Sequence, residues 1–168
     1  GINEVQNFGK FAVTGKDARK WLSTIMAGRI PVAGRMSLTP MLSPKGRLMG
    51  DFTVSCLDEN NFQLTASYGA QEIHYRWFMK NLKGDVRVLN VSDRRTGFQI
   101  AGPKSRELLS LCTRYDVSTV KFLDVVRMTV GQVDCTVQRV SYTGDLGYEI
   151  YCDPMDQRQL WQTLWNAG

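Results

Sequence analysis

The sequence predicts an α+β protein, and two observations carry that prediction. First, the segment GKFAVTGKDARKWLSTI, from Gly9, has the same form as GFQIAGPKSRELLSLC, from Gly97. Each reads as a strand, a glycine turn and a helix with an apolar side, and the two lie about 87 residues apart. Second, strand patterns joined by short turns lie between and after these units. This organisation is typical of an α+β domain with internal pseudo-symmetry.

Strands are expected wherever β-branched, aromatic and aliphatic residues are bounded by turn residues. The turn compositions SPKGR and DENN separate three of these runs. The expected strands are residues 8–14, 36–42, 48–57, 62–66, 86–91, 126–130, 133–140, 141–143 and 148–152, with a strand also opening the second repeated unit at Gly97.

Helices are expected where apolar residues recur every three or four positions. Residues 16–26 carry such a stripe, and residues 71–82 carry i, i+4 apolar pairs. A further helix follows Gly102, and Pro103 suits its first position. A final helix begins after Asp153, a capping residue, with Pro154 just inside it.

Composition excludes several classes of function. The chain has 168 residues, 43% apolar and 22% charged, and no apolar run reaches the roughly 18 residues of a membrane span. The net charge of +5 comes from scattered basic residues interleaved with acids, which argues against nucleic-acid binding. No phosphate-binding loop, nucleophile elbow or dinucleotide fingerprint occurs. The chain has one histidine and four separated cysteines, so we expect no metal site and buried thiols.

Asp51 is the first candidate for chemistry. It follows Gly50 and precedes an alternating strand, and glycine lets a ligand approach the backbone closely. A carboxylate there could orient a nucleophilic amine or stabilise a cationic intermediate. The alternative is an ordinary turn acid.

Tyr142 and Glu149 form the second candidate, in SYTGDLGYEIY. Strands on either side of the glycine turn could bring both side chains to one pocket, where the carboxylate accepts two N–H donors, as an amino-pteridine presents. The alternative is simple alternation, with Glu149 facing solvent.

These motifs resemble the aminomethyltransferase, or glycine-cleavage T-protein, family. YTGDLGYEI is similar to its YTGE-x-G-[YF]-E motif, GRLMGDFTV to its GG-x-x-DD-x-x-V segment, and both strand–glycine–helix units to its repeated units. The likeness covers the whole chain. LTPMLSPKGRLMGDFTV together with HYRWF looks closest to the folate-binding portion of dimethylglycine or sarcosine dehydrogenase-like flavoproteins.

The resemblance implies a tetrahydrofolate site. It implies that Asp51 assists one-carbon transfer, with Thr53 beside it, and that Tyr142 and Glu149 hold the pteridine. Phe8 matches an apolar pteridine neighbour, and Ser67 stands where the T-protein has a folate-contacting Asn. The sequence departs from the family at Gly50, which replaces the first Asp of the pair, and at Asp145, which replaces the motif's Glu.

The implied reaction forms 5,10-methylenetetrahydrofolate from an amine-derived iminium. The iminium would come from an FAD-binding domain that this chain does not contain, and a C-terminal barrel would complete the parent protein. The chain begins at Gly1 and closes at a helix stop, so we expect a piece of a longer chain that has little activity alone. The expected location is the bacterial cytoplasm or the mitochondrial matrix. A glycine-cleavage aminomethyltransferase and a non-catalytic folate-binding scaffold are the alternatives.

For the fold, we expect a ferredoxin-like sheet-and-helix domain formed by residues 1–27 and 92–168. Residues 28–91 would form an inserted small β-rich module that carries Asp51.

Overall fold

A computed structural model describes all residues, 1–168, and the chain forms two compact units. Unit 2 contains residues 7–92, and unit 1 contains residues 1–6 and 93–168. Each unit has one five-stranded antiparallel sheet and two α-helices, so the α+β prediction is confirmed. None of the helices is long and apolar enough to cross a membrane.

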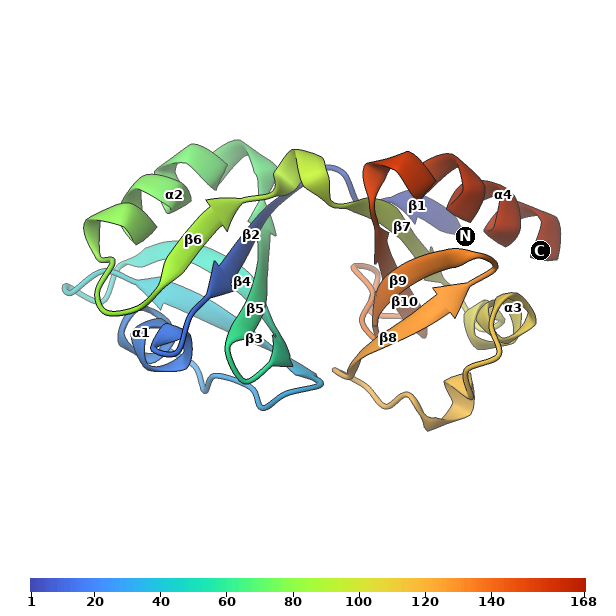
Figure 1. The fold of residues 1–168 in the computed structure, drawn as a ribbon, viewed down its shortest axis with the longest axis horizontal. Coiled ribbons are helices and arrows are strands. Elements are labelled where there is room, and N and C mark those ends of the chain that lie inside the picture. Colours follow the sequence, from blue (N-terminus) through green and yellow to red (C-terminus); the bar gives the residue numbers. More distant parts are fainter. The chain divides into compact units, whose positions relative to one another are not determined.

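Unit 2 has the sheet order β3-β4-β5-β2-β6 (Figure 1). Its elements are β2 (Phe8–Thr14), α1 (Ala18–Ile25), β3 (Arg35–Leu42), β4 (Leu48–Asp58), β5 (Asn61–Ser67), α2 (Gln71–Lys80) and β6 (Arg87–Asn90). Both helices pack on the same face of the sheet, where Trp21 and Phe78 join Phe11 and Phe52 in one core. Apolar side chains dominate this core, as the helix stripes predicted.

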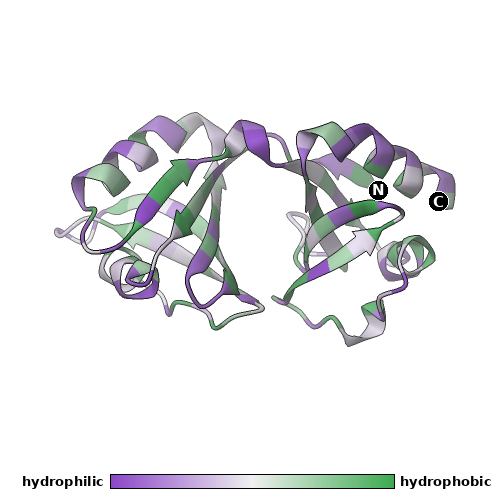
Figure 2. Cartoon of the chain, viewed as in Figure 1, coloured by the Kyte–Doolittle hydropathy of each residue, from purple (hydrophilic) through white to green (hydrophobic).

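Unit 1 has the sheet order β1-β7-β10-β9-β8. Its elements are β1 (Ile2–Glu4), β7 (Thr96–Ala101), α3 (Ser105–Cys112), β8 (Val125–Val130), β9 (Val133–Gln138), β10 (Gly147–Cys152) and α4 (Gln157–Ala167). Leu109 of α3 and Leu160 of α4 pack with Ile150 and Val137 in its core. Hydrophilic residues predominate along the outer sides of α2 and α4 (Figure 2). Single-turn 3-10 helices occupy Tyr68–Ala70, Ser92–Arg94, Val117–Thr119 and Pro154–Asp156.

The two sheets have the same plan, but their edge strands are exchanged. β1 precedes β2 in the chain yet pairs with β7, with Ile2 opposite Ile100. β6 precedes β7 yet pairs with β2, with Val88 opposite Val13. Read from β3 and from β8, the two sheets then match strand for strand, so β5 corresponds to β10 and β4 to β9.

This edge-strand exchange divides the chain differently from the sequence-based division. The sequence predicts that residues 1–27 join residues 92–168, with 28–91 as an insert. Instead, β2 pairs with β5 along its whole length and with β6, so residues 7–92 form one unit. The sequence-based division placed both repeated strand–glycine–helix segments in one domain, whereas each unit contains one of them.

All four cysteines are free and buried, as expected. Burial raises the pKa of each thiol, to about 12 for Cys135 and about 11 for Cys152. They therefore stay protonated at neutral pH and contribute apolar volume to the cores.

The turn after β2 packs closely against the backbone of Asp85, and only glycine fits there. Gly15 has a φ of +128°, and a Cβ there would collide with the backbone carbonyl of Asp85. We expect Gly15→Ala to lower the free energy of unfolding by about 3 kcal/mol or more. Gly69→Ala, where nothing lies near the added carbon, should change it by under about 1 kcal/mol. Urea denaturation measures both, and equal effects would contradict this account of the turn.

Candidate functional site

Unit 2 presents one polar sheet face opposite its helices. On β4, Phe52, Val54 and Cys56 belong to the core, so alternation turns Asp51, Thr53 and Ser55 to the other face. The same alternation turns Phe8, Lys10 and Ala12 of β2 and Gln63, Thr65 and Ser67 of β5 to that face.

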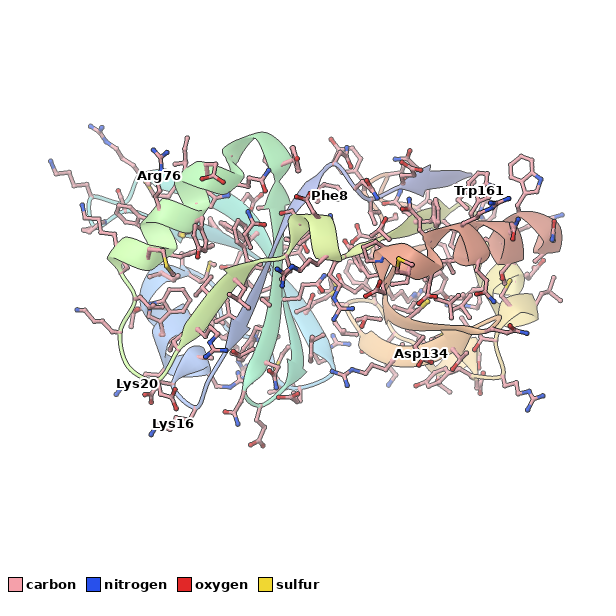
Figure 3. The ribbon with its side chains drawn as sticks, turned by 45° about the horizontal axis from the view of Figure 1, so that its top comes forward. Phe8, Lys16, Lys20, Arg76, Asp134 and Trp161 are labelled. Atoms are coloured by element: carbon pink, nitrogen blue, oxygen red, sulfur yellow. The ribbon has the colours of Figure 1, made fainter.

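Four of the residues singled out in the sequence gather at one end of this face. Asp51 lies opposite Pro40, Thr53 lies opposite Thr65, and Ser67 lies opposite Phe8. Phe8 is at the start of β2 (Figure 3). Asp51 is exposed, and Thr53 is half-buried. The structure therefore brings Phe8, Asp51, Thr53 and Ser67 onto one face of one sheet.

The backbone that carries Asp51 is supported from the helix side by His74 of α2. The His74 ring packs on Phe52 with 4.7 Å between centroids. A Cβ at position 50 would meet both His74 and Phe52 closely, so Gly50 makes room for the imidazole. Gly50, where the sequence departs from the paired-Asp motif it resembles, thus lies directly against the His74 ring. Burial lowers the pKa of His74, and a hydrogen bond to the Met49 backbone opposes this.

Unit 1 has the equivalent polar face, and Glu149 of β10 lies in the middle of it. Its cross-strand neighbours are Gln99 of β7 and Gln138 of β9. Residues directly opposite one another in an antiparallel pair share a face, so the three side chains form a row. Glu149 is 8% exposed and accepts a hydrogen bond from the Tyr151 hydroxyl at 2.7 Å. Simple alternation predicted that Glu149 faces solvent, but its side chain is buried.

Gln138 has the least usual environment in this row. The residue is fully buried, yet neither its amide nitrogen nor its amide oxygen has a hydrogen-bond partner. Leaving such groups unpaired costs about 1–3 kcal/mol each, and native proteins contain few of them. Sequence reasoning missed Gln99 and Gln138 because a lone glutamine carries no motif; only the strand register reveals the row.

Tyr142 lies close to this row through its backbone, not its ring. Its N–H donates to the side-chain oxygen of Gln99 at 2.8 Å. Residues 141–143 form part of the turn between β9 and β10, so the strand expected there is absent. The Tyr142 side chain is 85% exposed, in contrast to buried Glu149. The two side chains thus differ in environment, although Gln99 connects their segments.

The chain belongs to the GCVT N-terminal domain family, whose profile matches residues 1–168. Mitochondrial dimethylglycine dehydrogenase of Homo sapiens is 34% identical, over 99% of this chain and 20% of its own length. The aminomethyltransferase of Clostridium botulinum (strain Kyoto / Type A2) is 33% identical, over 100% of this chain and 46% of its own length. The chain therefore spans a fifth to just under half of these curated relatives.

Solved structures show the same fold. Glycine cleavage system aminomethyltransferase T from Bartonella henselae superposes with a TM-score of 0.85 at 21% identity, over 98% of this chain and 45% of that chain. Heterotetrameric sarcosine oxidase from Corynebacterium sp. U-96 gives a TM-score of 0.78 at 16% identity, over 99% of this chain and 82% of that chain. The resemblance drawn from the motifs is confirmed.

His74 should make stability depend on pH. Its pKa is lower in the folded protein than the ordinary 6.5, so the unfolded chain binds more protons below that pH. The free energy of unfolding should fall as the pH drops below about 6.5, by at most about 1.4 kcal/mol per pH unit from this group. His74 is the only histidine. Between pH 7.5 and 5.5, the free energy of unfolding of wild type, measured by denaturation, should therefore fall relative to that of His74→Gln. Parallel pH profiles would show that His74 is not responsible.

Proposed function

We propose that this domain is the tetrahydrofolate-binding, one-carbon-transfer portion of a dimethylglycine or sarcosine dehydrogenase-like enzyme. The enzyme would form 5,10-methylenetetrahydrofolate from an iminium derived from the amine. An FAD-binding domain and a C-terminal barrel elsewhere in the parent protein would complete it. Sequence similarity to dimethylglycine dehydrogenase supports this proposal. The proposed location is the bacterial cytoplasm or the mitochondrial matrix.

The observation that carries the proposal is the row Gln99, Glu149 and Gln138. The edge of a pteridine presents an amino group and a ring N–H as donors beside a carbonyl acceptor. A buried carboxylate accepts from two neighbouring donors, and an amide with both atoms unpaired supplies one donor and one acceptor. These residues fit the group, and we assign the pteridine to Glu149 and Gln138. Tyr142 would add its exposed ring as a stacking surface.

Asp51 has the opposite character and a different proposed role. Its carboxylate is exposed, on the face shared with Thr53, Ser67 and Phe8. When bound, the folate supplies a nucleophilic amine nitrogen. Asp51 would accept the proton from that amine or stabilise the positive charge of the iminium. Phe8 offers an apolar contact, and Thr53 and Ser67 offer hydroxyl groups for orientation.

Two other functions remain candidates. Similarity to the aminomethyltransferase of Clostridium botulinum, over the whole of this chain, favours a glycine-cleavage aminomethyltransferase. Here Gly50 precedes Asp51 in place of a pair of aspartates, which favours the dehydrogenase-like function instead. A folate-binding scaffold without transfer chemistry would not need Asp51. The Asp51→Asn variant described below therefore distinguishes this scaffold from a transferase.

Glu149→Gln should weaken tetrahydrofolate binding by about 10- to 100-fold. The change keeps the size of the side chain but replaces a charged acceptor, and hydrogen bonds to charged groups contribute about 1.5–3 kcal/mol. Calorimetric titration of tetrahydrofolate into the full-length protein measures the affinity. Glu107→Gln is the matched control, because Glu107 is an exposed acid on α3 of the same unit. Equal affinities for wild type and Glu149→Gln would remove the pteridine assignment.

Asp51→Asn should leave tetrahydrofolate affinity within about twofold but slow methylene transfer by about 100-fold or more, since a positioned acid or base typically contributes 10²–10⁴ in rate. The yield of 5,10-methylenetetrahydrofolate per amine oxidised, in the full-length enzyme, reports the transfer step. Glu59→Gln, an exposed acid in the turn after β4, is the control. Unchanged transfer in Asp51→Asn would make Asp51 a turn acid and favour the scaffold reading.

A further inference from the structure

We propose that the polar face of unit 2 contains a second binding site, for a carboxylate group, formed by Ser55, Gln63 and Thr65. This inference deepens the proposed function, on which the identity of the ligand rests. It adds residues that no sequence motif singles out.

Three unpaired polar groups carry the inference. The hydroxyl oxygens of Ser55 and Thr65 and the amide nitrogen of Gln63 are buried without any hydrogen-bond partner. The three residues are 0%, 6% and 5% exposed. Each such group costs about 1–3 kcal/mol when left unpaired. Three on one face of one sheet therefore indicate a place where a ligand supplies the partners.

Strand register puts these groups next to one another. Ser55 lies directly opposite Gln63, and Thr65 is two residues along β5 from Gln63. Opposite residues have Cβ atoms about 5 Å apart, and i, i+2 neighbours on a strand are about 7 Å apart. A carboxylate can bridge donors at such spacings.

The unpaired groups of unit 2 occupy the same sheet positions as the polar row of unit 1. β5 corresponds to β10 and β2 to β7, so Gln63, opposite Ala12, stands where Glu149, opposite Gln99, stands in unit 1. Ser55, opposite Gln63, stands where Gln138 stands. The chemistry is reversed, because the central acceptor of unit 1 is replaced by a side chain whose unpaired atom is a donor.

The unpaired groups on this face suit a ligand with acceptor oxygens. All three unpaired groups can donate, and Lys10, directly opposite Thr65, is fully buried on the same face. Its ammonium group donates to the Phe8 carbonyl at 3.0 Å. Along β4 the face changes from exposed Asp51 through half-buried Thr53 to buried Ser55.

Two sources can supply this carboxylate: the amine substrate and the glutamyl group of folate. The test titrates N,N-dimethylglycine, acetate, tetrahydrofolate and a tetrahydropterin without a glutamyl group into the full-length protein. We expect Thr65→Val and Ser55→Ala each to weaken the binding of ligands from one of these two sources by about tenfold. Weaker binding of dimethylglycine and acetate identifies the substrate carboxylate; weaker binding of tetrahydrofolate with unchanged tetrahydropterin identifies the glutamyl group.

Thermal stability separates a binding role from a structural one. Because the wild-type groups are unpaired, the apolar replacements should leave the melting temperature of the ligand-free protein unchanged or raise it. Ser23→Ala, on the exposed side of α1, is the control. A marked fall in melting temperature, unchanged binding of every ligand, or weaker binding of the tetrahydropterin would each overturn the proposal. Failure of tetrahydrofolate to bind wild type would instead count against the proposed function, since the acetate arm does not depend on folate.

Discussion

Strand alternation in the two antiparallel sheets is the constraint on which the rest of the structure depends. Every second side chain of a strand points to the helices and must be apolar to build a core. The remaining side chains share the opposite face, where strand register decides which of them meet. In unit 1 that register aligns Gln99, Glu149 and Gln138, and in unit 2 it aligns Gln63 and Ser55. A slip of one residue in any strand would bury the polar set in the core.

The same constraint explains why the polar faces carry the proposals. Buried amide and hydroxyl groups without partners oppose folding, and the apolar cores of both units must compensate for them. A chain selected only for stability would replace them with valine or leucine. Their presence at equivalent positions of the two sheets supports the proposal that both faces bind ligands. The exposed Asp51 differs, because solvent satisfies it at no cost to stability.

Much of the fold could be predicted from the sequence, because most strands and helices have clear periodicity and turn residues. β1 could not, since three residues show no alternation, and with it the edge-strand exchange was missed. Asp51 and Glu149 were found through motifs and glycine neighbours. Gln138 and Ser55 were not, because their importance lies in cross-strand register and in the absence of a hydrogen-bond partner. Tyr142 was expected in a strand, but the Gly-rich segment after it forms a turn.

A crystal structure of the protein with tetrahydrofolate bound tests the central claim most directly. The account predicts that the amino-pyrimidine edge of the pteridine lies within hydrogen-bond distance of the Glu149 carboxylate and that the Gln138 amide pairs with the same ring. A pteridine bound away from the unit 1 sheet, with Gln138 contacting only water, would contradict it.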